Sequence, residues 1–288
     1  MALGGQSLLG QQKQAPLFTF GVMADVQYAE QKNAGTRHYR SSPRKLREAV
    51  KAFNSQKVDF VLHLGDFIDQ GFRHFDTLNA LTGQLRMPLY HVLGNHDFSV
   101  EPAEKPRVLS KLGLEKPYYS FSKPGWRFIV LNGNDISLFA NSRGDEKHRQ
   151  AGGWLKKLKE EGAVNAYDWN GAVGKQQLDW LKKELAAARE EGEQVLIACH
   201  YPLYPDDAAE LLWNAPELRK LVEASPQVRA WFNGHVHQSQ HFRENQVNYV
   251  SFRGLVEEEK NAFAIVAVFR DRLEITGYGA EESRVLAR

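Results

Sequence analysis

The sequence predicts an α/β fold in which two mixed sheets are stacked face to face and flanked by helices, a four-layer α-β-β-α sandwich. Short apolar runs alternate with helical patterns through most of the 288 residues, which is typical of parallel βαβ units. Near the C-terminus the apolar runs instead come in pairs, and a short turn at 270–271 joins the last pair, as in antiparallel strands. Two stacked sheets accommodate this order of elements.

The first half of the chain indicates three strands with helices between them. The run FTFGVMA predicts the first strand, and Ser42, followed by proline, predicts the N-cap of a helix. Leu46, Val50 and Phe53 recur at helical spacing and mark the core face of that helix. VDFVLHL and LYHVL predict the next strands, with the helix FDTLNALTGQLR between them. YYSFS and WRFIVLN, joined by KPG, predict an antiparallel hairpin.

The second half opens with a long polar insertion at 133–173, in which we expect one helix, GGWLKKLKEE, and a functional or mobile loop. The clearest helix follows in GKQQLDWLKKELAAAREEG, with Leu178, Leu181 and Leu185 on one side. VLIAC and VRAWF predict two more strands around the helix APELRKLVEA. We expect a disordered or processed tail over 1–15 and a single domain over 16–288.

Composition excludes several classes of function. The formal net charge is +2 and no dense Lys/Arg block is present, so we expect no nucleic-acid partner. No stretch approaches the roughly 18 apolar residues of a membrane span. Cys199 is the single cysteine, so no intrachain disulfide can form, and its place in VLIAC predicts a core thiol. We expect a cytoplasmic monomer, and the alternative is an exported protein whose N-terminal tail is the remainder of a signal segment.

Polar side chains follow directly on five of the predicted strands, in the segments ADVQ, GDFID, GNHD, CHYP and GHVH. A GD or GN pair alone is a common turn, but the complete ordered set is far more specific. The carboxyl ends of strands meet at one edge of an α/β sheet, where such folds bind their ligands. Carboxylate, amide and imidazole groups from five places suit two divalent cations bridged by one carboxylate. The sequence therefore predicts a hydrolytic metalloenzyme.

These motifs, over residues 18–237, resemble the calcineurin-like metallophosphoesterase superfamily. The resemblance implies that the first cation is held by Asp25, Gln27, Asp66 and His237. It implies that the second is held by Asp66, Asn95, His200 and His235. His96 would be catalytic without binding metal, and Asp69 would orient it. A water held between the two cations would attack phosphorus in line.

The first motif departs from the superfamily pattern, since Gln27 stands where most members have histidine. A carboxamide oxygen favours Mn²⁺ or Mg²⁺ over Zn²⁺, with Fe also compatible, and we expect Mn²⁺. Together with GTRHYR, NAYDWNGAVGKQQLDWL, HYPLYPDDA and FRGLVEE, the motif ADVQYA resembles the manganese-dependent ADP-ribose/CDP-alcohol diphosphatase branch. The resemblance implies hydrolysis of a nucleoside diphosphate to a nucleoside monophosphate and a phospho-sugar or phospho-alcohol.

Candidate substrate contacts lie in the loops around these motifs, with aromatic residues for base stacking and arginines for the distal phosphate. They are Tyr28, Arg37, Arg40, Trp169, Asn170, Tyr204, Trp213 and Asn214. Loop packing and surface charge are the alternative interpretation of the same residues.

Two other functions stay open. One is a metal-dependent phosphodiesterase or phosphomonoesterase acting on cyclic nucleotides, phospholipid head groups or simple phosphate esters. The other is a non-catalytic protein that retains the fold, and the filled ligand positions together with His96 argue against it.

Overall fold

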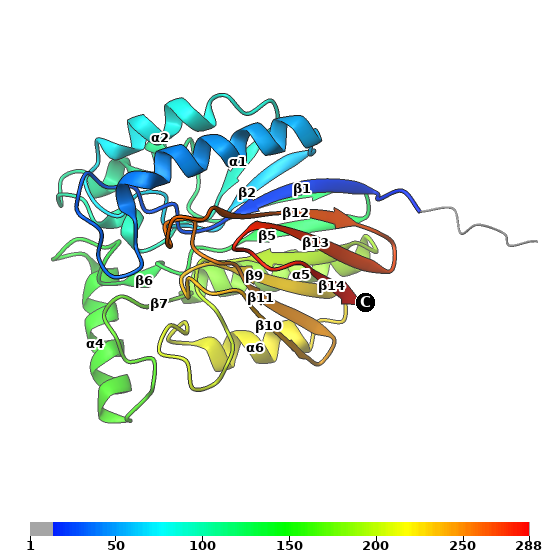
Figure 1. Cartoon of the computed structure of the whole chain (residues 1–288). Helices are drawn as coiled ribbons and strands as arrows, with labels where there is room; N and C mark the ends of the chain where they lie inside the picture. The colour runs from blue at the N-terminus through cyan, green and yellow to red at the C-terminus, as the bar shows by residue number, and fades with distance from the viewer. Residues whose placement is uncertain (1–13, 288) are drawn as a thin grey trace, which may run out of the picture.

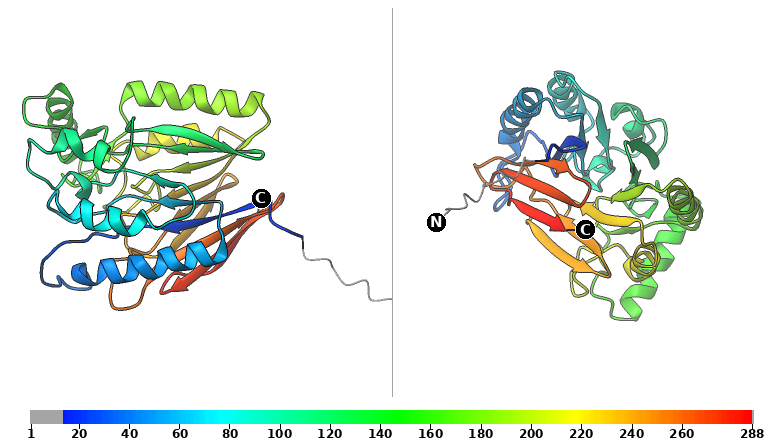
Figure 2. Two further views of the ribbon diagram at one scale, coloured as in Figure 1. Left: turned by 90° about the horizontal axis from the view of Figure 1, so that it is seen from above. Right: turned by 90° about the vertical axis from the view of Figure 1, so that its right-hand side faces the viewer.

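The computed structural model describes residues 14–287, so nearly all of the tail predicted over 1–15 lies outside the described residues. Two six-stranded sheets are stacked with helices on their outer faces (Figures 1 and 2). The strand orders are β14-β13-β12-β1-β2-β3 and β10-β11-β9-β8-β5-β4. Each sheet mixes parallel and antiparallel pairs, which confirms the predicted α-β-β-α sandwich.

The first sheet joins the N-terminal strands to the C-terminal ones. Its parallel strands are β1 (Phe18–Met23), β2 (Phe60–His63) and β3 (Leu89–His91). Its antiparallel strands are β12 (Ala262–Val268), β13 (Arg272–Gly279) and β14 (Arg284–Ala287). Two helices cover its outer face, α1 (Ser42–Gln56) and α2 (His74–Thr82) (Figure 1).

Helix α1 has the predicted core face but a different start. Leu46, Val50 and Phe53 are buried as predicted. The predicted N-cap Ser42 is instead the first helical residue, and Ser41 occupies the cap position. The Ser41 hydroxyl donates to the carbonyl of His38 (2.7 Å), so it does not cap the helix.

The second sheet is formed by the central part of the chain. Its strands are β4 (Tyr119–Lys123), β5 (Trp126–Val130), β8 (Gln194–Ala198), β9 (Val228–Asn233), β10 (Gln240–Glu244) and β11 (Val247–Ser251). The predicted hairpin β4–β5 is antiparallel, whereas β5, β8, β9 and β11 are parallel. The outer face is covered by α5 (Lys175–Glu190) and α6 (Ala215–Glu223). The predicted apolar side of α5 and the thiol of Cys199 are buried here.

Aromatic side chains fill the space between the two sheets. Phe20 of β1 stacks on Phe60 of β2 with ring centroids 4.9 Å apart, and Phe128 of β5 meets Phe60 edge-on at 5.1 Å. Burial of such large apolar surfaces, with favourable ring geometry, stabilises the contact between the sheets. The carboxyl ends of β1, β2, β8 and β9 are thereby held at fixed relative positions.

The insertion is more structured than predicted. Its helix α4 (Glu146–Glu160) begins six residues before the predicted GGWLKKLKEE segment. Two short strands, β6 (Ile136–Ser137) and β7 (Gly171–Ala172), pair and close the insertion at its base. The remaining short helices are η1 (Tyr39–Ser41), η2 (His96–Phe98), η3 (Lys105–Arg107) and α3 (Val108–Lys111). Within residues 14–287, none of the helices has the length and apolar character needed to cross a membrane.

Candidate metal centre

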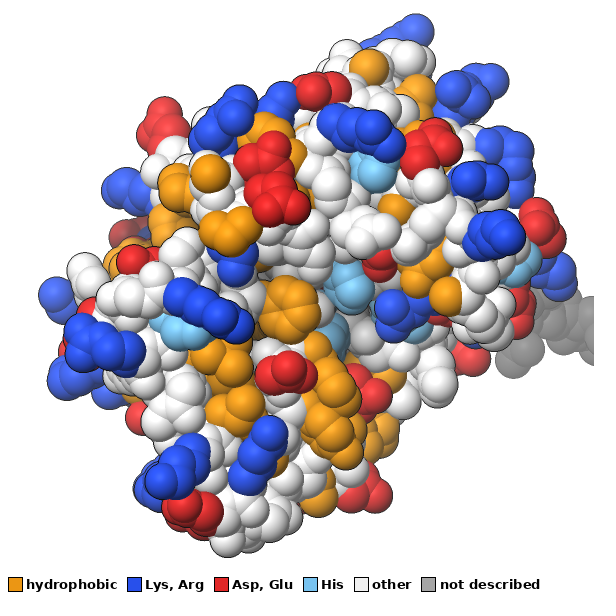
Figure 3. Space-filling view, turned by 90° about the vertical axis from the view of Figure 1, so that its left-hand side faces the viewer, with side chains coloured by type: hydrophobic (Ala, Val, Ile, Leu, Met, Phe, Trp, Pro, Cys, Tyr) orange, Lys and Arg blue, Asp and Glu red, His pale blue; other side chains and the backbone are white. Residues whose placement is uncertain are grey.

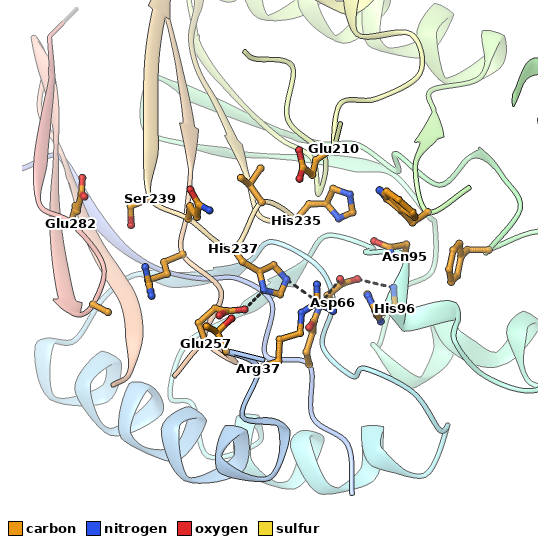
Figure 4. Close-up of a pocket in the computed structure, with 18 residues that line it drawn as sticks. Arg37, Asp66, Asn95, His96, Glu210, His235, His237, Ser239, Glu257 and Glu282 are labelled. Carbon is orange, nitrogen blue, oxygen red and sulfur yellow. Dashed lines mark hydrogen bonds and ion pairs between the residues drawn. The ribbon is translucent and has the colours of Figure 1, made fainter. Parts of the chain in front are cut away.

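The predicted ligands lie at the carboxyl ends of strands from both sheets. Asp25, Asp66 and Asn95 follow β1, β2 and β3 of the first sheet. His200 and His235 follow β8 and β9 of the second sheet. The prediction of one sheet edge is therefore wrong in this respect: the site forms where the edges of two stacked sheets meet (Figure 4).

The four residues predicted to hold the first cation are in mutual contact. The amide nitrogen of Gln27 lies 2.9 Å from Asp66 Oδ2 and 3.2 Å from His237 Nε2. His237 Nε2 in turn lies 3.3 Å from Asp25 Oδ1. Carboxylate, carboxamide and imidazole groups are thus joined in one cluster by these contacts.

The residues predicted to hold the second cation gather on the other side of Asp66. The ligand atoms of Asp66, His200 and His235 all lie within 4.8 Å of one another. His200 Nε2 lies 3.3 Å from Asp66 Oδ2 and 3.2 Å from Asn95 Oδ1. Asp66 therefore touches both groups, which is the position that a bridging carboxylate requires.

Several features of the centre fit bound cations. Within residues 14–287, the Oε1 atom of Gln27 is buried without a hydrogen-bond partner, and a cation would offset its desolvation. His200 Nδ1 is bonded to the carbonyl of Leu64 (2.8 Å) and His237 Nδ1 to Glu257 Oε1 (2.7 Å). Such outer partners orient imidazole ligands and leave Nε2 for the metal. The donor set therefore fits two divalent ions.

The backbone at the centre is strained. Five of the seven predicted ligands have a positive φ: Asp25 (49°), Gln27 (41°), Asp66 (57°), His235 (66°) and His237 (60°). Left-handed conformations are unfavourable for residues with a side chain, and they persist where the surrounding fold imposes them, often at functional sites. Among the described residues, five of the nine non-glycine positions with a positive φ are predicted ligands, and this concentration points to a functional site.

Glycines allow the ligand turns to approach one another. A Cβ atom on Gly94 would lie 2.1 Å from Asp66 Oδ1, and one on Gly234 would lie 2.5 Å from Asp25 Oδ2. The glycines of the GNHD and GHVH motifs are thus required by close packing against the carboxylates. Asp97 supports the same turn as predicted, because its carboxylate accepts the backbone N–H groups of Gly94 (2.9 Å) and Phe67 (2.8 Å).

Opposing electrostatic effects set the protonation of the centre. Burial lowers the pKa of His200, but the Asp66 carboxylate has the opposite and larger effect, and the pKa is raised to about 9. Burial likewise lowers the pKa of His237, and Asp25 raises it to about 9. For His235, burial and the neighbouring His200 hold the pKa well below its usual value, so this imidazole is neutral and ready to bind metal.

His96 and Asp69 form the predicted pair beside the cluster. His96 Nδ1 lies 3.1 Å from both the carboxylate Oδ1 and the backbone carbonyl of Asp69. Burial lowers the pKa of His96, yet the charges of Asp66 and Asp69 raise it to about 9. With Nδ1 engaged by Asp69, Nε2 is the ring nitrogen left for a substrate in the pocket that His96 lines.

A pocket of about 910 Å³ opens over the metal centre. Histidine side chains are visible in the hollow of this face (Figure 3). Two of the predicted substrate contacts, Arg37 and Trp169, line the pocket together with Gln27, Asp66 and His96. Trp169 is 38% exposed and stacks on Tyr167 with ring centroids 4.1 Å apart.

Two predicted contacts in the first loop have other partners. The Tyr28 hydroxyl donates to Glu30 (2.6 Å), and its ring packs on His74. Arg40 is exposed and lies 3.7 Å from Glu30. Neither is among the described residues that line the pocket, so the structure does not support their predicted role.

The substrate contacts predicted after the His200 motif and in the insertion also have other partners within the protein. Tyr204 donates to Glu223 (2.8 Å), while buried Trp213 donates its indole N–H to the Tyr167 carbonyl (3.1 Å). Asn214 is buried and ties down the backbone of residue 173. Tyr204, Trp213 and Asn214 are not among the described residues that line the pocket. Their polar groups are instead bonded to residues far away in the chain. Asn170 instead places Oδ1 3.2 Å from His235 Nε2 and so contacts a predicted ligand.

Glu257 is a functional residue that sequence reasoning missed. Its carboxylate accepts from His237 Nδ1, and its side chain also lines the pocket. The only signal was its position in the segment FRGLVEE, which carries no ligand motif. A glutamate of this kind cannot be told from a surface charge until its partner is located.

The comparisons with known proteins agree with this geometry. The sequence pattern of the family described as "Calcineurin-like phosphoesterase" matches residues 18–239. The chain belongs to the calcineurin-like phosphoesterase family. It is similar to a dimetal phosphatase from Danio rerio, with a TM-score of 0.85, 27% identity, and coverage of 94% of this chain and 99% of that one. The protein is therefore a metal-dependent phosphoesterase, as the motifs predicted.

Relatives that are named for an enzymatic activity match over nearly the whole chain. A protein of Arabidopsis thaliana named "Manganese-dependent ADP-ribose/CDP-alcohol diphosphatase" is 31% identical, with 93% of this chain and 96% of that protein covered. A Xenopus laevis protein of the same name is 28% identical, with 94% and 90% covered. The branch resemblance seen in the sequence is thus confirmed.

Proposed function

We propose that the protein hydrolyses the diphosphate linkage of ADP-ribose or of CDP-alcohols, giving a nucleoside monophosphate and a phospho-sugar or phospho-alcohol. The observation that carries this proposal is the likeness, over more than nine tenths of the chain, to proteins named for that activity. The complete ligand cluster around Asp66 supports it, since a protein that retained only the fold would not need strained ligand turns.

The metals of this reaction are two divalent cations, for which we propose Mn²⁺. Asp25, Gln27, Asp66 and His237 would hold the first, and Asp66, Asn95, His200 and His235 the second. The Gln27 carboxamide is a harder ligand than imidazole and favours Mn²⁺ over Zn²⁺. When bound, such a pair supplies Lewis acidity toward the phosphoryl oxygens and an activated water.

The residues of the chain supply proton transfer and binding. The charges of Asp66 and Asp69 raise the pKa of His96 and so favour its protonated form, from which Nε2 would donate a proton to the departing phosphate oxygen. Asp69 orients the ring through Nδ1 and so keeps Nε2 toward the pocket. Trp169 offers an exposed aromatic face to the base, and Arg37 offers its guanidinium to phosphate.

A substrate panel tests the proposal. The chelated protein is reloaded with Mn²⁺, Mg²⁺ or Zn²⁺ and assayed with ADP-ribose, CDP-glycerol, 2′,3′-cyclic AMP and p-nitrophenyl phosphate. We expect the two nucleoside diphosphates to have the highest kcat/KM, with Mn²⁺ the best metal. A result in which these are the poorest substrates would favour the phosphodiesterase or phosphomonoesterase alternative.

A further inference from the structure

We propose that Arg253 binds the substrate phosphate that is not at the metal centre, and thereby selects diphosphates over esters with one phosphate. The inference rests on the proposed function. A nucleoside diphosphate carries two charged phosphoryl groups, and hydrolysis places one of them at the cations. Arginine matches phosphate oxygens in both charge and geometry, and two arginines, Arg37 and Arg253, line the pocket. We assign Arg253 to the group away from the cations, with Arg37 left to the phosphate at the centre.

Arg253 lies next to the residues that are predicted to hold the first cation. It follows β11 and precedes Gly254, which pairs with Ala24 next to Asp25. A Cβ atom on Gly254 would lie 3.1 Å from the His237 ring, so this backbone is packed against a predicted ligand. Arg253 lines the same pocket as Asp66 and His237.

A buried glutamate fixes this wall of the pocket. The Arg253 backbone N–H donates to Glu281 Oε2 (2.7 Å), and the Ser239 hydroxyl donates to Glu281 Oε1 (2.8 Å). Arg284 also donates to Glu281 (3.1 Å). In Figure 4, Ser239 lies on the opposite side of His237 from Asn95 and His96. Arg253 and Ser239 therefore form a polar wall on the far side of the centre from His96.

The Arg253 guanidinium is only weakly engaged by the protein. Its ion pair with half-exposed Glu258 is long, at 3.4 Å. Within residues 14–287, its Nε atom is buried and has no hydrogen-bond partner. Arg127 provides the contrast, because it contacts three glutamates at 2.7 to 3.3 Å. The Arg253 side chain keeps 25% of its surface exposed at the pocket, so a phosphate oxygen would meet the terminal nitrogens of the guanidinium rather than the buried Nε.

This position also assigns a direction to the substrate. Trp169 is next to Asn170, which contacts His235 on the second-cation side. Arg253 is on the first-cation side, next to Gly254 and His237. The nucleoside would therefore lie toward Trp169, and the sugar phosphate or alcohol phosphate toward Arg253 and Ser239.

Kinetics on two substrates test the assignment. Arg253→Gln, Arg253→Lys and a control, Arg149→Gln on exposed helix α4, are assayed with ADP-ribose and with bis(p-nitrophenyl) phosphate. For Arg253→Gln we expect kcat/KM on ADP-ribose to fall about 10- to 100-fold, mainly through KM, because the contact binds ground state and transition state alike. The one-phosphate substrate should be hydrolysed unchanged, the lysine variant should be intermediate, and the control should match the wild type.

A binding measurement separates this inference from the proposed function. We expect Arg253→Gln to weaken binding of the α,β-methylene analogue of ADP-ribose in calorimetry, and to leave binding of inorganic phosphate unchanged. Equal losses on both ligands, or no loss on either, would overturn the role of Arg253. Failure of the wild type to hydrolyse ADP-ribose or CDP-glycerol would overturn the proposed function. Binding of the α,β-methylene analogue to the wild type and to Arg253→Gln would still test the role of Arg253.

Discussion

The metal centre and the outer wall of the pocket are built in opposite ways. At the centre, Asp66 is buried, its backbone is left-handed, and it contacts Gln27 and His200 at once. At the wall, Trp169 is more than one third exposed and Arg253 holds only a long ion pair. The centre is shaped by folding itself, whereas the wall keeps polar and aromatic groups free for a substrate.

The difference teaches where each kind of change should act. Substitutions at the centre remove chemistry or metal, because every group there depends on its neighbours. Substitutions at the wall change binding and leave the rate constant of the bound complex nearly intact. Four predictions follow this gradient from the largest effect to the smallest.

Replacement of His96 should have the largest effect. For His96→Ala we expect kcat to fall about 10²- to 10⁴-fold, because the proton donor is lost while the ligands stay in place. Steady-state kinetics with Mn²⁺ measure the change, and circular dichroism checks the fold. Asn95→Ala should also lower turnover strongly, since Asn95 Oδ1 contacts His200. Unchanged rates in both variants would remove the assigned mechanism.

A methyl group at Gly94 should disturb the centre itself. The added Cβ would lie 2.1 Å from Asp66 Oδ1 and 2.3 Å from the Asp66 backbone nitrogen, so the carboxylate predicted to bridge the cations must move. We expect Gly94→Ala to lower Mn²⁺ affinity about 10- to 100-fold, measured by calorimetry.

The control for Gly94→Ala is a glycine with free space around it. Gly152 lies within helix α4 and an added Cβ would meet nothing within 4 Å. Gly152→Ala should raise the free energy of unfolding by about 0.5–1 kcal/mol and leave metal binding unchanged. Equal metal affinity in the two variants would contradict the close packing at Gly94.

At the pocket wall, Trp169 and Tyr204 should differ sharply. Trp169→Ala should raise the KM for ADP-ribose about 5- to 100-fold, the effect of losing one base stack, with kcat nearly constant. Tyr204→Phe should leave KM unchanged and cost about 1 kcal/mol of stability, because the bond from the hydroxyl to Glu223 is lost. A raised KM for Tyr204→Phe would return this residue to the substrate site.

The smallest effect on catalysis is expected for Lys45, which anchors the loop of Glu257 and acts on stability. Burial lowers the pKa of Lys45 to about 8 from its ordinary 10.5, and its ammonium donates to the carbonyls of Glu257 and Glu258. Between pH 8 and 10.5 the unfolded chain binds more protons here than the folded protein does. The contribution of Lys45 to the free energy of unfolding therefore rises with pH in this window.

Denaturant unfolding of the metal-free protein and of Lys45→Met at pH 7, 8, 9 and 10 checks this. The loss of two hydrogen bonds lowers the free energy of unfolding of the variant by a constant amount. The slope of the free energy of unfolding against pH should differ between the two proteins. Comparison at each pH also removes the contribution of the histidines, which both proteins share. Parallel curves would show that Lys45 has no shifted pKa.

Much of the centre was predictable because its positions are encoded locally. Each predicted ligand follows an apolar strand within a few residues, and parallel strands bring such turns together whatever the rest of the chain does. His96 and Asp69 belong to the same motifs, so their pairing was also predictable. The glycines of these motifs are recognisable for the same reason: Gly94 and Gly234 each face a carboxylate across a turn, and Gly65 faces the His200 ring.

The sequence by itself determined the α/β class, because that class depends on local strand and turn patterns. The resemblance of its motifs to a known family added the predicted ligand set and the phosphate chemistry. Only the tertiary structure decided that two sheets share the site, that Tyr204 and Trp213 are structural, and that Glu257 and Arg253 face the pocket. The orientation of a loop side chain depends on partners far away in the chain. Tyr204 is held by Glu223 and Tyr249, and no local pattern specifies such contacts.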